Sequence, residues 1–184
     1  MRKGGVGGAA TQKAGEAFES KTLRNLLASF ETNGYEVDSI LEGGLNPRAI
    51  YLKNKEGQLV DIFLQSSVHT EFFKPRGVDT NDYFSAELRP DTAIYSHKTK
   101  VLTIIEKKQQ TGAGSVAEKL QTCDYKMLYY TTLCKPIGVK VDLIWQLGQY
   151  FVDNQKALRS VFSYMESKGS RHFFLDVPFE ALNI

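Results

Sequence analysis

Apolar residues recur along this chain with two different periods, one typical of helices and one typical of strands. Spacings of three and four predict helices, which cover residues 15–33, 115–135 and 154–168. Alternating or continuous apolar runs predict strands, which cover 35–41, 49–53, 58–65, 91–95, 101–108, 139–147 and 171–177. This order of elements is typical of an α/β or α+β fold with a central mixed β-sheet flanked by helices.

Two stretches show neither period. Residues 1–14 are rich in glycine, which resists regular structure, so we expect an N-terminal arm followed by a single domain over 15–184. Such an arm is either a frayed terminus or a segment whose backbone can lie close to a phosphate chain. Residues 66–89 mix aromatic and basic side chains, and an irregular stretch of this length in a small domain is usually functional or mobile.

Composition narrows the class of protein. The chain has 184 residues, of which 42% are hydrophobic and 24% charged, and this excludes a wholly disordered protein. No apolar run approaches the ~18 residues of a membrane-spanning helix, and the N-terminus resembles no secretory signal, so we expect no membrane partner. The two cysteines lie in no metal-binding or disulfide motif, which favours a reducing, cytoplasmic location.

Charge is unevenly distributed although the formal net charge is only +2. Residues 97–140 carry eight lysines and three acidic residues, whereas residues 31–96 carry six basic and eleven acidic residues. A local excess of lysine can bind a polyanion such as DNA, or it can simply form a solvated face.

The strongest candidate for chemistry lies in the predicted hairpin over 91–108. Side chains alternate along a strand, so Glu106 and Lys108 share a face with Leu102 and Ile104. The antiparallel partner strand folds Asp91 back beside them. Two carboxylates and a backbone carbonyl can hold Mg²⁺, and an ammonium group can orient water or stabilise charge on a phosphate. Each residue taken alone is more typical of an ordinary strand end or turn, and it is the combination that points to this chemistry.

Pro90-Asp91 followed by Glu106-Lys107-Lys108 resembles the motif of the PD-(D/E)XK nuclease superfamily. The resemblance implies a core of one helix, three strands, a helix and a strand. It also implies that Asp91, Glu106 and the carbonyl of Lys107 bind Mg²⁺, and that Lys108 is the catalytic lysine. A carboxylate on the first helix often joins such a site, and Glu19 matches it better than Glu16 does. The alternative for Glu19 is a carboxylate that favours the helix dipole.

A narrower resemblance concerns the opening residues 4–19 and residues 106–122, which are similar to segments of some type II restriction endonucleases. It implies Mg²⁺-dependent hydrolysis of double-stranded DNA at a short specific sequence, leaving 5′-phosphate ends, with a possible companion DNA methyltransferase. Cutting two strands with one active site per subunit favours a homodimer. The alternatives are a structure-specific DNA nuclease, such as a Holliday-junction resolvase or repair nuclease, and a non-catalytic DNA-binding subunit.

Candidate DNA contacts lie on both sides of the motif. Gln110 is expected to continue the strand on the face of Lys108, and Ser115 opens a helix whose free amides suit a phosphate. Other candidates are basic, namely Lys119, Lys126, Lys74, Arg76 and Arg89, with Arg171 in a second group after the last helix. Each of these is alternatively plain surface.

Overall fold

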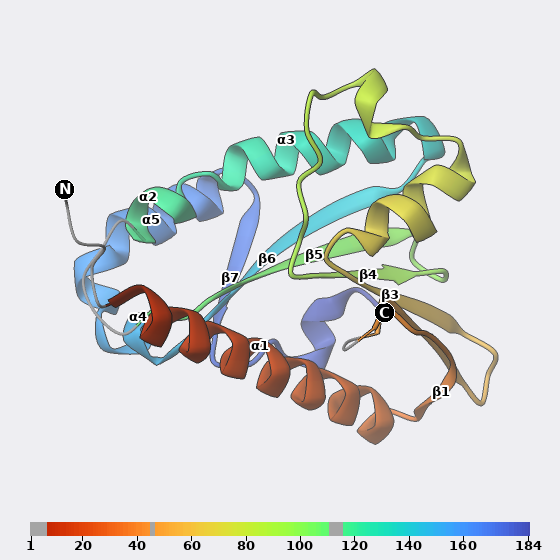
Figure 1. Ribbon diagram of the computed structural model, residues 1–184, viewed down its shortest axis with the longest axis horizontal. Coiled ribbons are helices and arrows are strands. Elements are labelled where there is room, and N and C mark those ends of the chain that lie inside the picture. The colour runs from red at the N-terminus through yellow and green to blue at the C-terminus, as the bar shows by residue number, and fades with distance from the viewer. Residues whose placement is uncertain (1–6, 45–46, 111–115) are drawn as a thin grey trace.

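A seven-stranded mixed sheet with helices on both faces forms the centre of the fold (Figure 1). The structure is a computed structural model that describes residues 7–44, 47–110 and 116–184. The strands follow chain order across the sheet, as β1 (Tyr35–Leu41), β2 (Ala49–Asn54), β3 (Leu59–Leu64), β4 (Thr92–Ser96), β5 (Val101–Lys108), β6 (Lys140–Leu147) and β7 (Ser170–Phe174). Neighbours from β1 to β5 are antiparallel, and β5, β6 and β7 are parallel. The predicted α+β class is therefore confirmed.

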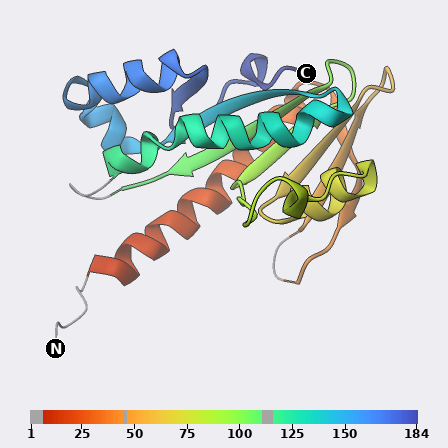
Figure 2. The same ribbon diagram turned by 90° about the horizontal axis from the view of Figure 1, so that it is seen from above.

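The two faces of the sheet bury separate apolar clusters. Helix α1 (Gly7–Thr32) covers one face with Leu26 and Phe30, which pack with Ile105 of β5. Helices α3 (Cys123–Cys134) and α5 (Gln155–Ser167), with the short α2 (Val116–Leu120) and α4 (Gln149–Asp153), cover the other. Figure 2, seen from the α3 side, shows α1 crossing beneath the sheet. Each helix packs an apolar face against the core, and this packing is the main source of the helix's stability.

The hairpin formed by β4 and β5 has the predicted geometry. Thr92 pairs with Ile105, so Asp91 comes opposite Glu106 at the end of the ladder. Ile104 packs on the α3 side and Ile105 on the α1 side, which confirms the predicted alternation along β5. The face shared by Leu102 and Ile104 therefore continues to Glu106 and Lys108.

Helix α1 begins at Gly7, whereas the glycine content predicted a helix start at residue 15 and an arm over 1–14. The arm is therefore wrong for 7–14, and residues 1–6 lie outside the described residues. Adding a residue to an existing helix is much easier than starting a new one. The run from Ala9 to Ala14 has favourable helix propensity, so it can extend the packed helix despite the neighbouring glycines.

The second predicted helix is divided into α2 and α3 at residues 121–122. The hydroxyl of Thr122 donates a hydrogen bond to the Lys119 carbonyl at 2.7 Å, a local bond that competes with continuous helix. Helix α4 was not predicted, since five residues are too few to show a period.

The irregular stretch over 66–89 is part of the core. It contains a π-helix, η1 (Val68–Phe73), and two short 3₁₀ turns, η2 (Lys74–Arg76) and η3 (Thr80–Asp82). Phe72 and Phe73 are fully buried. The buried His69 ring lies 2.7 Å from the Leu88 carbonyl through Nε2 and 2.9 Å from the Thr80 hydroxyl through Nδ1. These contacts give the segment a packing role that its lack of period did not indicate.

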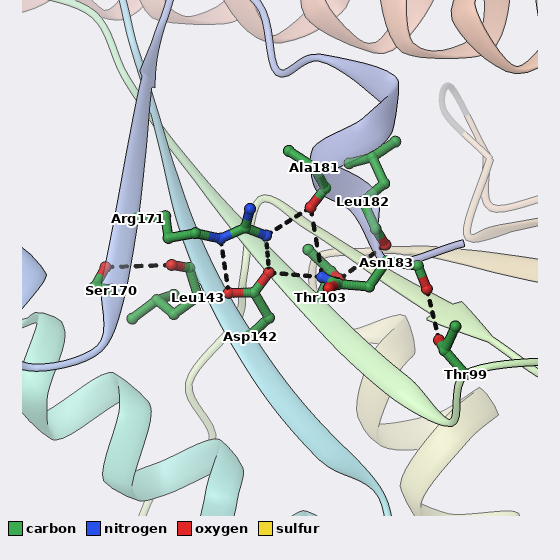
Figure 3. Close-up of polar contacts among 9 residues, drawn as sticks. All are labelled: Thr99, Thr103, Asp142, Leu143, Ser170, Arg171, Ala181, Leu182 and Asn183. Carbon is green, nitrogen blue, oxygen red and sulfur yellow. Dashed lines mark hydrogen bonds and ion pairs between the residues drawn. The ribbon is translucent and has the colours of Figure 1, made fainter.

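A polar network joins the chain end to the sheet (Figure 3). Arg171 of β7 forms an ion pair with Asp142 of β6 and donates to the Ala181 carbonyl. Asn183 donates to Asp142 at 2.8 Å, and Thr99 donates to the Asn183 carbonyl at 2.5 Å. Arg171 is therefore engaged within the protein, whereas the sequence suggested it as a candidate DNA contact.

Two further expectations concern the cysteines and the membrane. Cys123 and Cys134 are both buried free thiols, and burial raises the pKa of Cys134 to about 12. In the described part of the chain, no helix combines the length and the apolar character needed to cross a membrane.

Candidate active site

The end of the β4–β5 hairpin gathers the residues of the predicted motif. The Lys108 ammonium nitrogen lies 3.9 Å from Asp91 Oδ2 and 3.7 Å from Glu106 Oε2. All three side chains are at least partly buried. The expectation that the hairpin brings them together is therefore confirmed.

Glu106 is the most deeply buried of the three, with 3% of its side chain exposed. Its Oε1 accepts a hydrogen bond from Nζ of Lys126, on α3, at 2.6 Å. Burial raises the pKa of Glu106, and the positive charges of Lys126 and Lys108 oppose that rise. The carboxylate thus has two ammonium groups beside it, of which Lys126 is the closer.

Trp145 of β6 forms the floor of this cluster. It pairs with Glu106 in the parallel register and is fully buried. Lys108 Nζ lies 5.7 Å and Lys126 Nζ 5.9 Å from its ring centroid, within the range of cation–π attraction. Its buried indole N–H finds no hydrogen-bond partner among the described residues.

Asp91 directly precedes β4, at the end of an interior strand, where both faces of the sheet reach it. Its Oδ2 accepts a hydrogen bond from the Lys107 backbone N–H at 2.6 Å. On the α1 side it borders a cavity of about 540 Å³. Glu19, Arg48 and Lys107 also line this cavity. Asp91 is therefore common to the lysine-rich cluster and to the cavity.

Glu19 belongs to the cavity side of the site. It is exposed on α1, and its charge acts on Lys107. The alternation along β5 directs Lys107 to the α1 face and Glu106 with Lys108 to the α3 face. The structure thus brings Glu19 near Asp91 but on the other side of the strand from Glu106.

Lys107 is buried, and this gives a test of the local electrostatics. Burial lowers its pKa from 10.5, and the charges of Asp91 and Glu19 oppose the fall. The unfolded chain therefore keeps the Lys107 proton up to a higher pH than the folded protein does. The free energy of unfolding should accordingly rise as the pH increases from the lowered pKa toward 10.5. Lys107→Met should remove that gain. Urea unfolding at about pH 7 and about pH 10 measures it, and exposed Lys140→Met should leave it intact.

The oxygen donors of the site suit a magnesium ion. Among the described residues, no three His, Cys, Asp or Glu side chains gather at a point that could hold a metal. Mg²⁺ needs fewer protein ligands, because it keeps several waters and is often held by one or two carboxylates. Asp91 and Glu106, both beside the Lys108 ammonium, and the backbone carbonyl of Lys107 fit that requirement.

Several predicted DNA contacts are exposed near the motif or before it. Lys119 is exposed on α2, and Lys74 and Arg89 are exposed between β3 and β4. Arg89 is two residues from Asp91, so it is the nearest of these to the site along the chain. Ser115 lies outside the described residues.

Gln110 does not continue the strand as the sequence predicted, and Arg76 is partly engaged within the protein. Strand β5 ends at Lys108, where the Gly148 N–H donates to the Lys108 carbonyl at 2.8 Å, so Gln110 does not continue the strand. The Arg76 guanidinium lies 4.1 Å from the ring centroid of Phe72 and donates to the Phe72 carbonyl at 2.9 Å. Part of its hydrogen-bonding capacity is therefore used inside the protein.

Trp145 is a site residue that the sequence did not single out, and Lys126 was considered only as a possible contact to the DNA backbone, not as a partner of Glu106. In the sequence, Lys126 is equally typical of a solvated helical lysine, and Trp145 is part of an apolar strand. Chemically, the cluster can hold a cation between carboxylates and offer ammonium groups to an anion.

No protein-family model matches the chain, and no curated protein matches its sequence.

Proposed function

We propose that the protein is a type II restriction endonuclease, which hydrolyses phosphodiester bonds of double-stranded DNA at a short specific sequence with Mg²⁺. One observation carries the proposal: the Lys108 ammonium lies between the carboxylates of Asp91 and Glu106 at the end of β5. These residue types, in this hairpin, are those that the resemblance to the PD-(D/E)XK superfamily implies. The products would carry 5′-phosphate ends.

The order of elements supports the same superfamily core. Helix α1 precedes the antiparallel strands β3, β4 and β5, and α3 and the parallel strand β6 come after them in the chain. This order matches a helix, three strands, a helix and a strand. Strands β1 and β2 extend the antiparallel side of the sheet, and β7 extends the parallel side.

Each residue of the cluster has a role in this proposal. Asp91, Glu106 and the Lys107 carbonyl would hold Mg²⁺, which when bound neutralises negative charge and lowers the pKa of water. Lys108 orients the attacking water and stabilises charge that develops on the phosphate. Glu19 contributes negative charge from the cavity side of Asp91.

The proposed assembly is a homodimer, because two copies related by a two-fold axis can each cut one strand of a palindromic site. A companion DNA methyltransferase would protect the host DNA. The buried free thiols of Cys123 and Cys134 suit the reducing cytoplasm in which such an enzyme would act.

A structure-specific nuclease, such as a junction resolvase or repair nuclease, is the second candidate. It would use the same residues for the chemistry. The burial of Phe72 and Phe73 favours it, because part of the segment over 66–89 serves the core instead of being wholly available to read bases. A non-catalytic DNA-binding subunit is disfavoured by the clustering of Asp91, Glu106 and Lys108.

Parallel digestion of two substrates tests the proposed specificity. Purified protein and its Asp91→Asn variant are incubated with Mg²⁺ and either linear plasmid DNA or a synthetic four-way junction. Discrete plasmid fragments from the unaltered protein alone are the expected result. Cutting of the junction without plasmid fragments would instead establish the structure-specific alternative.

A further inference from the structure

The buried carboxylate of Glu106 has a close cation that the protein itself supplies. Lys126 Nζ lies 2.6 Å from its Oε1, whereas Lys108 Nζ is 3.7 Å from its Oε2. A carboxylate with 3% exposure requires a compensating charge, since burying an isolated charge is very costly. Lys126 supplies that charge through a direct hydrogen bond, and Lys108 adds a weaker contribution from further away.

The surroundings of Lys126 would let its ammonium group leave this position. It projects from α3, and its side chain keeps 17% exposure, so a path to solvent exists. Its neighbours Tyr125 and Leu128 on α3 are exposed. A lysine side chain is a compact charge on a flexible stem, and it can reorient without moving the helix backbone.

A divalent cation and Lys126 would compete for the same carboxylate. A metal held by Glu106 would come within a few ångströms of the ammonium group, where two positive charges repel each other strongly. Lys126 therefore lowers metal affinity as long as it stays. Its charge is needed, however, while the carboxylate is buried without a metal.

We propose that Lys126 is a resident counter-ion, which neutralises Glu106 in the metal-free protein and is displaced when a divalent cation binds. This inference rests on the proposed function, because it assumes that Glu106 is a metal ligand. The displaced ammonium remains tethered beside Lys108, on the face where the scissile phosphate would lie. Metal binding thereby prepares a second cation for the DNA backbone, so the two ligands favour each other's binding.

Binding of Mn²⁺ to the DNA-free protein tests the proposal without any activity measurement. Mn²⁺ takes the same oxygen ligands as Mg²⁺ and is counted directly from the electron paramagnetic resonance signal of the free ion. Lys126→Met keeps the aliphatic stem and removes the charge, and it should bind Mn²⁺ about tenfold more tightly. Lys140→Met is the matched control, because Lys140 pairs with Val101 at the opposite end of β5 and should leave the affinity unchanged.

The single tryptophan gives a second readout. Both lysines lie within 6 Å of the Trp145 ring, so displacement of Lys126 should change its fluorescence. Mn²⁺ also quenches by itself, so Mg²⁺ is the titrant here. The unaltered protein and Lys140→Met should show a Mg²⁺-dependent change, and Lys126→Met should show a smaller one, because the moving charge is absent.

The outcomes separate this inference from the proposed function. Equal or weaker Mn²⁺ binding by Lys126→Met would overturn the counter-ion role, and metal-dependent DNA cleavage by the unaltered protein would still support a nuclease. Absence of Mn²⁺ binding in both proteins, together with no cleavage, would overturn both. If Lys126→Met fails to fold, Lys126→Gln decides, because it keeps a hydrogen-bond donor to Glu106 without the charge and should also bind Mn²⁺ more tightly.

Discussion

Lys108→Met is expected to slow DNA cleavage by about 100- to 1,000-fold, the size of loss seen when a key charge-stabilising group is removed. The ammonium group stands between Asp91 and Glu106, where it can face both the attacking water and the phosphate. Methionine keeps the stem that packs near Trp145, so the fold should be retained. The rate is measured under single-turnover conditions, with DNA binding measured separately in Ca²⁺.

The control for this loss is Lys140→Met, which removes the same charge from β6, beside the far end of β5. It should cut DNA at the rate of the unaltered protein. Asp91→Asn should lose cleavage to a similar extent, because its amide can still accept the Lys107 N–H bond but carries no charge for a cation. Full activity in folded Lys108→Met would contradict the assigned role of the lysine.

Asp142→Ala is expected to lower the free energy of unfolding by about 2–3 kcal/mol. The Asp142 side chain is only 16% exposed, and it accepts hydrogen bonds from both Arg171 and Asn183 (Figure 3). Its removal leaves Arg171 without its carboxylate and loosens η5 (Phe179–Leu182), which packs against α1. Urea unfolding gives the loss, and faster amide exchange in η5 would locate it.

Asp38→Ala is the matched control for this effect. Asp38 also forms an ion pair, with Lys53 at 2.6 Å, but its side chain is 45% exposed. An exposed pair of this kind contributes about 0–1 kcal/mol, so the variant should unfold nearly as the unaltered protein does. Equal losses in the two variants would show that burial of the Asp142 network contributes little.

The central part of the site could be predicted because it depends on local geometry. Alternation along β5 puts Glu106 and Lys108 on one face, and a tight antiparallel hairpin returns Asp91 beside them. Both facts follow from sequence pattern alone. The sheet order was equally accessible in outline, since each strand lies beside the next in the chain.

The rest of the site depends on contacts between distant elements. Lys126 lies twenty residues after Glu106 in the chain. It reaches Glu106 only because α3 packs on that face of the sheet. Glu19 was expected with Glu106, but α1 packs on the opposite face, where Lys107 is its neighbour. No spacing in the sequence states which helix covers which face, so these pairings required the structure.

The glycine-rich start of the chain and the segment over 66–89, which has no regular period, also led to wrong or incomplete local predictions. The glycines before residue 15 did not prevent α1 from beginning at Gly7, because helix extension is cooperative. The stretch over 66–89 shows no period, yet His69 and Phe72 anchor it in the core through tertiary contacts. In both segments, packing decides the structure more than local propensity does.

The most direct test of the proposed function is digestion of unmethylated phage DNA by the purified protein, with Mg²⁺ in one reaction and EDTA in the other. The proposal predicts discrete bands with Mg²⁺ only, 5′-phosphates at the sequenced ends, and no bands from Asp91→Asn. DNA that stays intact in both reactions, with a folded protein, would contradict a sequence-specific endonuclease. Bands that persist in EDTA would contradict the metal-dependent site built on Asp91 and Glu106.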